Sequence, residues 1–184
     1  MIAKRFILEN GKGTRILIVY PPALEKTWMR HFKELKIDSY TQYISNGSLH
    51  KILEGDNHYW DKGEYDLIII DEAHRYRNHT SQMFQAMQQI TKAPRLNKGG
   101  ISGQKKKVIL ISATPLNNKP EDIYNQLLLF QDSRNSTLPI QNLQSFFYPL
   151  SQKYKEIRNS ENVDFESLKD IFKIIRNKII EPIT

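Results

Sequence analysis

Three short runs of apolar, largely β-branched residues divide the chain at intervals. They cover residues 16–20, 67–70 and 108–111, and each is bounded by charged or turn residues. Strands buried on both faces have this nearly uninterrupted pattern, because helices cover both sides of a parallel sheet. The runs therefore predict three strands of a mostly parallel sheet, over residues 15–20, 65–71 and 107–112, with the ends of the second and third at the same edge.

Between and after these runs, apolar residues recur at helical spacing. One set follows Pro22, which suits a first helical turn, and another begins at the acidic start Pro120–Asp122. The faces are defined by Leu24, Trp28, Phe32 and Leu35, by Met83, Met87 and Ile90, and by Ile123, Leu127 and Phe130. Strands alternating with helices predict an α/β fold with right-handed crossovers.

The last quarter of the chain has no strand pattern. Apolar residues at helical spacing between Phe165 and Ile179 predict an amphipathic helix, and Leu143, Phe146 and Phe147 predict another. We therefore expect an α/β unit over residues 1–135 and a helical protrusion over residues 136–184. The Gly- and Lys-rich stretch between residues 92 and 107 is typical of a mobile basic loop.

Composition narrows the class of protein. Hydrophobic residues make up 39% of the 184 positions and charged residues 26%, as in a globular domain. The absence of cysteine excludes disulfides and thiolate zinc sites. No apolar run reaches the length of a membrane span, and the first residues lack the pattern of a signal peptide. We expect an intracellular protein, cytoplasmic if bacterial, with no membrane partner. The net charge of +7 makes a polyanionic partner plausible.

Two adjacent carboxylates, Asp71 and Glu72, end the second apolar run. Open α/β sheets bind ligands at the carboxyl ends of their strands. Nucleotide hydrolysis needs one carboxylate for Mg²⁺ and another to orient or deprotonate the attacking water. His74 lies two residues further and can link such a site to a neighbouring loop. The alternative, more common for an isolated Asp-Glu pair, is a solvated strand end with a surface histidine.

The third apolar run ends in two small hydroxyl residues, Ser112 and Thr114, followed by Pro115. Short hydroxyls can bridge to an adjacent carboxylate or imidazole, which suits a relay between parts of a site. The alternative is a polar strand exit in which both side chains bond to nearby backbone groups.

Taken together, D-E-A-H at residues 71–74 and S-A-T at residues 112–114 resemble motifs II and III of superfamily 2 helicases. Residues 16–22, followed by Trp28, look like motif Ia of the Swi/Snf-type branch. Residues 114–118, leading into 121–128, are similar to that branch's extended motif III, and residues 44–49 resemble motif Ib. The resemblance covers residues 1–130 and extends loosely beyond them, where this branch has helices that protrude from its first lobe.

This resemblance implies the first RecA-like lobe, of the P-loop NTPase type, of an ATP-dependent DNA helicase or translocase. ATP, Mg²⁺, double-stranded DNA and a second helicase lobe in the same parent chain are the implied cofactors and partners. Asp71 would hold Mg²⁺ and Glu72 would activate the water. The other implied roles are coupling of nucleotide state to nucleic-acid grip for His74, Ser112 and Thr114, and a phosphate-backbone track for Pro21, Pro22, Ser45 and Asn46.

The sequence departs from the family pattern in one important respect. The phosphate-binding G-x-G-K-T loop is absent, and N-G-K-G-T at residues 10–14 only superficially resembles it. A phosphate loop follows a buried strand and opens a helix, whereas here the predicted order is helix, Gly-Lys-Gly, strand. We expect Gly11 to cap a helix instead, with residues 1–9 as the back half of the helix that follows the phosphate loop in the family.

The resemblance therefore implies a chain cut at both ends, and residues 180–184 look like the run before an Arg-Arg element of this branch. Because phosphate loops and arginine fingers stabilise the transition state, we expect the isolated chain not to hydrolyse ATP. Two alternatives stay open. One is a non-catalytic nucleic-acid or protein binding module, and the other is an unrelated metal-dependent hydrolase that uses Asp71, Glu72 and His74.

Overall fold

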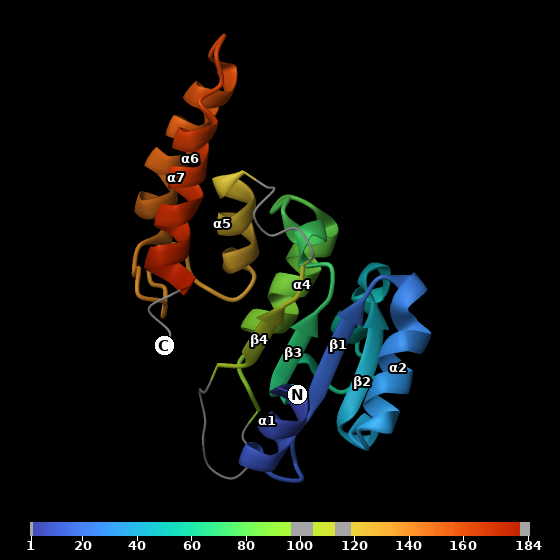
Figure 1. Ribbon diagram of the computed structural model, residues 1–184. Coiled ribbons are helices and arrows are strands. Elements are labelled where there is room, and N and C mark those ends of the chain that lie inside the picture. Colours follow the sequence, from blue (N-terminus) through green and yellow to red (C-terminus); the bar gives the residue numbers. More distant parts are fainter. Residues whose placement is uncertain (1, 97–104, 113–118, 181–184) are drawn as a thin grey trace.

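A four-stranded parallel sheet forms the centre of the molecule (Figure 1). The computed structural model describes residues 2–96, 105–112 and 119–180. The strands are β1 (Ile16–Tyr20), β2 (Thr41–Ser45), β3 (Leu67–Ile70) and β4 (Lys107–Leu110), in the spatial order β2-β1-β3-β4. Every pairing is parallel, which confirms the predicted type of sheet.

Helices connect and flank these strands. They are α1 (Ile2–Asn10), α2 (Glu25–Glu34), α3 (His50–Leu53), α4 (Gln82–Lys92), α5 (Pro120–Leu128), α6 (Leu143–Asn159) and α7 (Phe165–Ile175). Short 3₁₀ segments cover Pro22–Leu24, Asp38–Tyr40, Asn46–Ser48, Lys62–Glu64 and Ala73–Tyr76, and a π-helical turn covers Arg176–Ile180. No helix within the described ranges has both the length and the apolar character needed to span a bilayer.

Alternate residues of the two central strands enter two separate cores. Leu17, Val19, Ile68 and Ile70 face one cluster with α3 and α4, and Ile16, Ile18, Leu67 and Ile69 face the other with α1 and α2. Every residue of β1 and β3 is buried, as the uninterrupted apolar runs predicted. The sheet is therefore covered on both faces where β1 and β3 run through it.

The outer strands differ from the sequence prediction. β4 was expected to be doubly buried, but it lies at one edge of the described sheet, and its residues are only partly covered or exposed. Its apolar run reflects contacts on both faces, since Val108 and Leu110 pack on one core and Ile109 on the other. β2 was not predicted at all, because its only buried residues are Thr41 and Ile44, a weak pattern typical of an edge strand.

The connection between α1 and β1 is a helix cap, as expected. Gly11 follows the last residue of α1 with φ +83°, and its N–H donates to the carbonyl of Ile7 at 2.8 Å. A glycine in the left-handed region whose N–H donates to the carbonyl four residues earlier is a common helix C-cap. The Gly-Lys-Gly segment therefore leads from a helix into a strand, the reverse of the order that a phosphate loop requires.

A third core holds the helical part of the chain, which lies beside the sheet in Figure 1. Its buried members are Leu143, Phe147, Ile171, Ile175 and Ile179, from α6, α7 and the turn that follows. α5 contributes to two cores, because Ile123, Tyr124 and Leu127 pack on the third cluster while Leu128 packs on the first. The domain boundary at residue 135 thus remains a prediction, because α5, which precedes it, packs on the core of the sheet and on the core of the helical part.

Candidate functional site

The segments that carry the predicted site follow the carboxyl ends of four adjacent parallel strands. Tyr20 pairs with Ser45 and Val19 with Ile70, and Ile70 pairs with Leu110. The next residues along each strand therefore lie at one edge of the sheet, where α/β proteins place their ligands. The order along this edge is Ser45, Pro21, Asp71 and Ser112, so the predicted track and the predicted hydrolytic residues are neighbours.

Asp71 is held at its main chain and at both carboxylate oxygens. Its N–H donates to the carbonyl of Val19 at 2.8 Å. The indole Nε1 of Trp28 donates to Oδ2 at 2.8 Å, and the N–H of Glu72 donates to Oδ1 at 2.9 Å. Both donors are neutral N–H groups, so they fix the direction of the carboxylate without forming an ion pair.

Glu72 sits at a sharp turn with a strained backbone. Its φ of 52° and ψ of 48° place it in the left-handed region, which is uncommon for a residue with a long side chain. Such conformations cluster at functional sites, where the surrounding structure holds them. The side-chain Oε2 lies 3.0 Å from Nδ1 of His74, and both side chains are about one-third exposed. The turn therefore brings the second carboxylate and the histidine together.

The turn after β3 is bonded to the end of β4. The N–H of Ile111 donates to Ile70, and the N–H of Ala73 donates to the carbonyl of Ile111, both at 2.8 Å. Ser112, the next residue, has a buried Oγ with no hydrogen-bond partner among the described residues. The strand ends are thus adjacent, as predicted, and the relay role stays a prediction. Thr114, the second predicted coupling residue, lies outside the described residues.

Three buried polar atoms in the segments that follow β3 and β4 lack a hydrogen-bond partner in the described structure. They are Glu72 Oε2, His74 Nδ1 and Ser112 Oγ, the Glu72–His74 contact being close but without hydrogen-bond geometry. Unpaired buried polar atoms are rare and cost free energy. Their gathering on adjacent strand ends fits a site that acquires partners when a polar ligand binds.

The predicted track residues differ in exposure. Pro21 is buried, whereas Pro22 is exposed at the start of the 3₁₀ turn before α2. Ser45 is partly exposed, and its Oγ shares a hydrogen bond of 2.9 Å with the Oγ of Ser48. Pro22 and Ser45 are therefore the more accessible members of the predicted track.

Asn46 is buried at 4% exposure, and its Oδ1 accepts a hydrogen bond of 3.1 Å from the hydroxyl of Tyr76. Burial raises the pKa of Tyr76, so this hydroxyl stays protonated and acts as the donor. The contact ties the segment after β2 to the segment after β3. It favours a supporting role for the Asn46 side chain, and direct contact with a nucleic acid stays a prediction.

The residues present fit a Mg²⁺ ion held by one carboxylate, and they do not form a full protein cage. In the described ranges no three His, Cys, Asp or Glu side chains group so that they could hold a metal ion. Mg²⁺ in nucleotide sites takes one or two carboxylates, with phosphates and water as its other ligands. Asp71 can serve in this way, because each carboxylate oxygen has lone pairs beyond the one its N–H donor uses.

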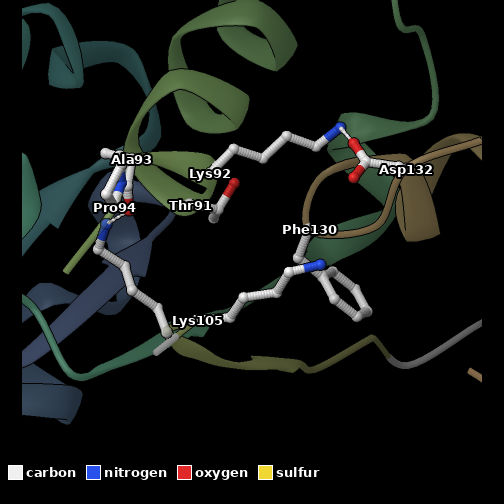
Figure 2. Close-up of a pocket in the computed structure, with 8 residues that line it drawn as sticks. Thr91, Lys92, Ala93, Pro94, Lys105, Phe130 and Asp132 are labelled. Atoms are coloured by element: carbon white, nitrogen blue, oxygen red, sulfur yellow. Dashed lines mark hydrogen bonds and ion pairs between the residues drawn. The ribbon is translucent and has the colours of Figure 1, made fainter. Parts of the chain in front are cut away.

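A cavity of about 160 Å³ lies at the amino ends of the strands, away from the candidate site and beside the start of β4 (Figure 2). Lys106 lies against it with its amine bonded to the carbonyl of Ala93, and Lys92 forms an ion pair of 3.5 Å with Asp132. Burial lowers the pKa of Lys106 to about 8. Residues 97–104 of the predicted basic loop lie outside the described residues. The cavity is separated from Asp71 by the length of the strands.

Two residues of this region were not predicted to contact the site. Trp28 entered the sequence analysis through the resemblance to motif Ia and as part of an apolar helix face, with no contact to Asp71 expected, and Tyr76 was not singled out. Their contacts span 43 and 30 residues, and local spacing does not encode such pairs.

Comparison with known proteins gives a consistent family. A family model described as the SNF2-related domain matches residues 48–177. The "uncharacterized ATP-dependent helicase YqhH" of Bacillus subtilis (strain 168) is 21% identical over 153 residues, which cover 71% of this chain and 23% of that protein. The chain thus spans about a quarter of that relative's length.

Among solved structures, the Sulfolobus solfataricus SWI2/SNF2 ATPase core in complex with dsDNA is similar to this chain. It aligns with a TM-score of 0.55 and 17% identity, over 92% of this chain and 34% of that one. At this identity the likeness concerns the fold, and it confirms the predicted RecA-like architecture.

Proposed function

The chain belongs to the SNF2-related domain family, and from that premise we propose that it supplies the hydrolytic and coupling strand ends of an ATP-driven helicase or translocase on double-stranded DNA. One observation carries the proposal. The parallel register brings Ser45, Pro21, Asp71 and Ser112 to one edge of the sheet in that order. Nucleic-acid grip and nucleotide hydrolysis would then occupy adjacent parts of a single edge.

Asp71 and Glu72 would divide the chemistry of hydrolysis. Asp71, its carboxylate oriented by two N–H donors, would hold Mg²⁺, which when bound with ATP neutralises charge on the phosphates. Glu72 would orient and deprotonate the attacking water, with its Oε2 lying 3.0 Å from Nδ1 of His74. The left-handed turn at Glu72 carries its carboxylate to His74, whereas the carboxylate of Asp71 contacts Trp28, so the two can hold different roles.

His74, Ser112 and Thr114 would couple the state of the nucleotide to the grip on DNA. His74 contacts Glu72, and Ser112 follows the residue whose carbonyl accepts from Ala73. These groups can exchange hydrogen bonds as nucleotide binds and leaves. The phosphate-backbone track at the neighbouring strand ends would consist of Pro21, Pro22, Ser45 and Asn46. We propose that the parent protein is intracellular.

The isolated chain is proposed to be inactive. The Gly11 segment caps a helix and cannot cradle phosphates. A phosphate loop, an arginine finger and the second lobe would come from the rest of the parent. We expect purified chain to show no ATP hydrolysis above background, with or without DNA. Turnover that Glu72→Gln abolishes would contradict the proposal that the isolated chain is inactive.

In the parent, Glu72→Gln should keep nucleotide binding and lose hydrolysis.

DNA binding can be tested in the chain itself by fluorescence anisotropy across a salt series. Lys26 is exposed in the first turn of α2, which follows the Pro22–Leu24 turn, whereas exposed Lys12 precedes β1 at the opposite end of the strands. Lys26→Ala should reduce the slope of log affinity against log salt by about 1. Lys12→Ala, the matched control, should leave it unchanged. Equal effects would argue against a track at this edge.

A second candidate function is a binding module without catalysis. A groove of about 540 Å³ between residues 77–79 and the helices α5 and α6 favours it, since such a surface could dock a partner. A parent that binds DNA normally but never hydrolyses ATP would support this alternative. The third possibility, a hydrolase built on a tight metal site at Asp71, Glu72 and His74, is disfavoured because these side chains do not group as metal ligands in the described structure.

A further inference from the structure

Trp28 joins the helix that starts at the predicted DNA track to the predicted metal ligand. It lies on α2, and its indole Nε1 donates a hydrogen bond of 2.8 Å to Oδ2 of Asp71. Asp71 directly follows β3, so the contact connects two elements that are 43 residues apart in sequence. It makes the direction of the Asp71 carboxylate depend on the position of α2.

Packing holds the indole in place. Its ring lies 5.7 Å from that of Phe32 at an interplanar angle of 60°. Phe32 is fully buried, and its ring meets that of Tyr43 on β2 edge-on, at 6.2 Å. The direction of the Trp28 N–H is therefore set by a row of aromatic rings between α2 and the sheet.

The other side of the carboxylate is equally fixed. Oδ1 accepts the N–H of Glu72 at 2.9 Å, and the main chain of Asp71 is bonded to Val19. Neither donor carries charge, so the carboxylate is oriented without being neutralised. Outer partners of this kind fix the geometry of metal ligands, and their loss lowers metal affinity.

We propose that Trp28 is a positioning residue that sets the direction of the Asp71 carboxylate toward Mg²⁺ and transmits movements of α2 to it. The inference rests on the proposed function of Asp71 as the Mg²⁺ ligand. The chain runs without a break from the Pro22–Leu24 turn into α2, and the N–H of Leu24 donates to Pro21 at 2.8 Å. Contact of DNA with this turn would shift α2, and the indole would carry the shift to Asp71.

The test removes the indole N–H and keeps the ring. The chain has two tryptophans, Trp28 and Trp60, so Trp60→Phe leaves Trp28 as the sole one. In that background, biosynthetic replacement of tryptophan by benzothienylalanine puts sulfur in place of the N–H. Binding of Mn²⁺, a probe that also prefers oxygen ligands, is measured by electron paramagnetic resonance of the free ion. We expect affinity to fall about tenfold, with the melting temperature unchanged.

Matched variants separate the outcomes. Asp71→Asn in the same background should abolish Mn²⁺ binding at this site. Trp28→Phe should lower Mn²⁺ affinity as much as the sulfur analogue does. Equal Mn²⁺ affinity with and without the N–H overturns the positioning role and leaves Asp71 as a ligand. A lower melting temperature with unchanged affinity does the same, since it marks a packing role. Absence of any Asp71-dependent Mn²⁺ binding overturns the inference for this chain, whereas the metal role of Asp71 is decided in the parent, where phosphates supply the other ligands.

Discussion

The side-chain amide of Asn125 donates a hydrogen bond of 2.7 Å to the main-chain carbonyl of Arg77. Asn125 lies on α5, which follows the segment that resembles motif III, and Arg77 lies just after the segment that resembles motif II. The bond therefore ties the helix after one motif to the turn after the other. It is largely shielded from water, since Asn125 is 9% exposed.

Removing this bond should loosen the helical part from the sheet. Asn125→Ala leaves the Arg77 carbonyl without its donor, and we expect the free energy of unfolding to fall by about 1–2 kcal/mol. Urea unfolding followed by circular dichroism measures the change. Asn135→Ala, at an exposed position, is the matched control and should stay within about 0.5 kcal/mol of the unaltered chain.

The helix-cap reading of Gly11 predicts a difference between two nearby glycines. Gly11 has φ +83°, whereas Gly13 has no positive φ, and a Cβ at either meets no atom within 4 Å. Gly11→Ala should destabilise the chain by about 1 kcal/mol, because alanine disfavours the left-handed region. Gly13→Ala should be neutral or slightly stabilising. Thermal melts of both variants check this, and equal effects would contradict the cap.

Lys106 predicts a pH dependence of stability at alkaline pH. Burial lowers its pKa to about 8 from the ordinary 10.5. Between these values the unfolded chain binds one more proton than the folded chain, so this residue makes stability rise with pH across that window. The stability difference between the unaltered chain and Lys106→Met should therefore shift in favour of the unaltered chain from pH 7.5 to pH 9.5.

Urea midpoints of both chains at the two pH values give this difference directly. Burial also raises the pKa of Tyr65 and of Tyr76. These groups lose their contribution only as pH rises above the ordinary tyrosine pKa, and the comparison with Lys106→Met cancels them. A constant difference between the chains would show that Lys106 keeps its ordinary pKa when folded.

The coupling role of Ser112 and Thr114 predicts a separation of activity from stability. Ser112 Oγ has no partner among the described residues, so Ser112→Ala in this chain should change stability by less than about 0.5 kcal/mol. In the parent, replacing both hydroxyl residues by alanine should preserve basal ATP hydrolysis and abolish most of its stimulation by DNA. If both instead cap backbone groups, stability should fall by about 1 kcal/mol per residue with stimulation intact.

The central part of the fold was predictable because its pattern is local. β1 and β3 are buried on both faces, and consecutive apolar residues announce this in the sequence. The weak pattern of β2 gives no such signal, since only Thr41 and Ile44 are buried. β4 has an apolar run but lies at an edge of the described sheet. This position was not predictable, because the sequence does not show which strand has a neighbour on each side.

The candidate site divides in the same way. Asp71 and Glu72 were identified because a strand and a carboxylate pair are adjacent in the sequence. The parallel register then confirmed that Asp71 and Ser112 share an edge. The bond from Trp28 to Asp71 and the burial of Asn46 against Tyr76 were not predictable, since each depends on residues brought together only by the crossovers.

The outer position of β4 has a consequence for the chain in concentrated solution. Within the described part of the sheet, no strand pairs with its outer side, and Ile111 just beyond it is 39% exposed. Unpaired N–H and C=O groups beside apolar side chains are a template for a strand from another molecule. β2, the other outer strand, is better protected by its polar Gln42 and Ser45. Self-association of this chain should therefore begin at β4, and a charged residue at Ile111 would be the smallest change that keeps copies apart.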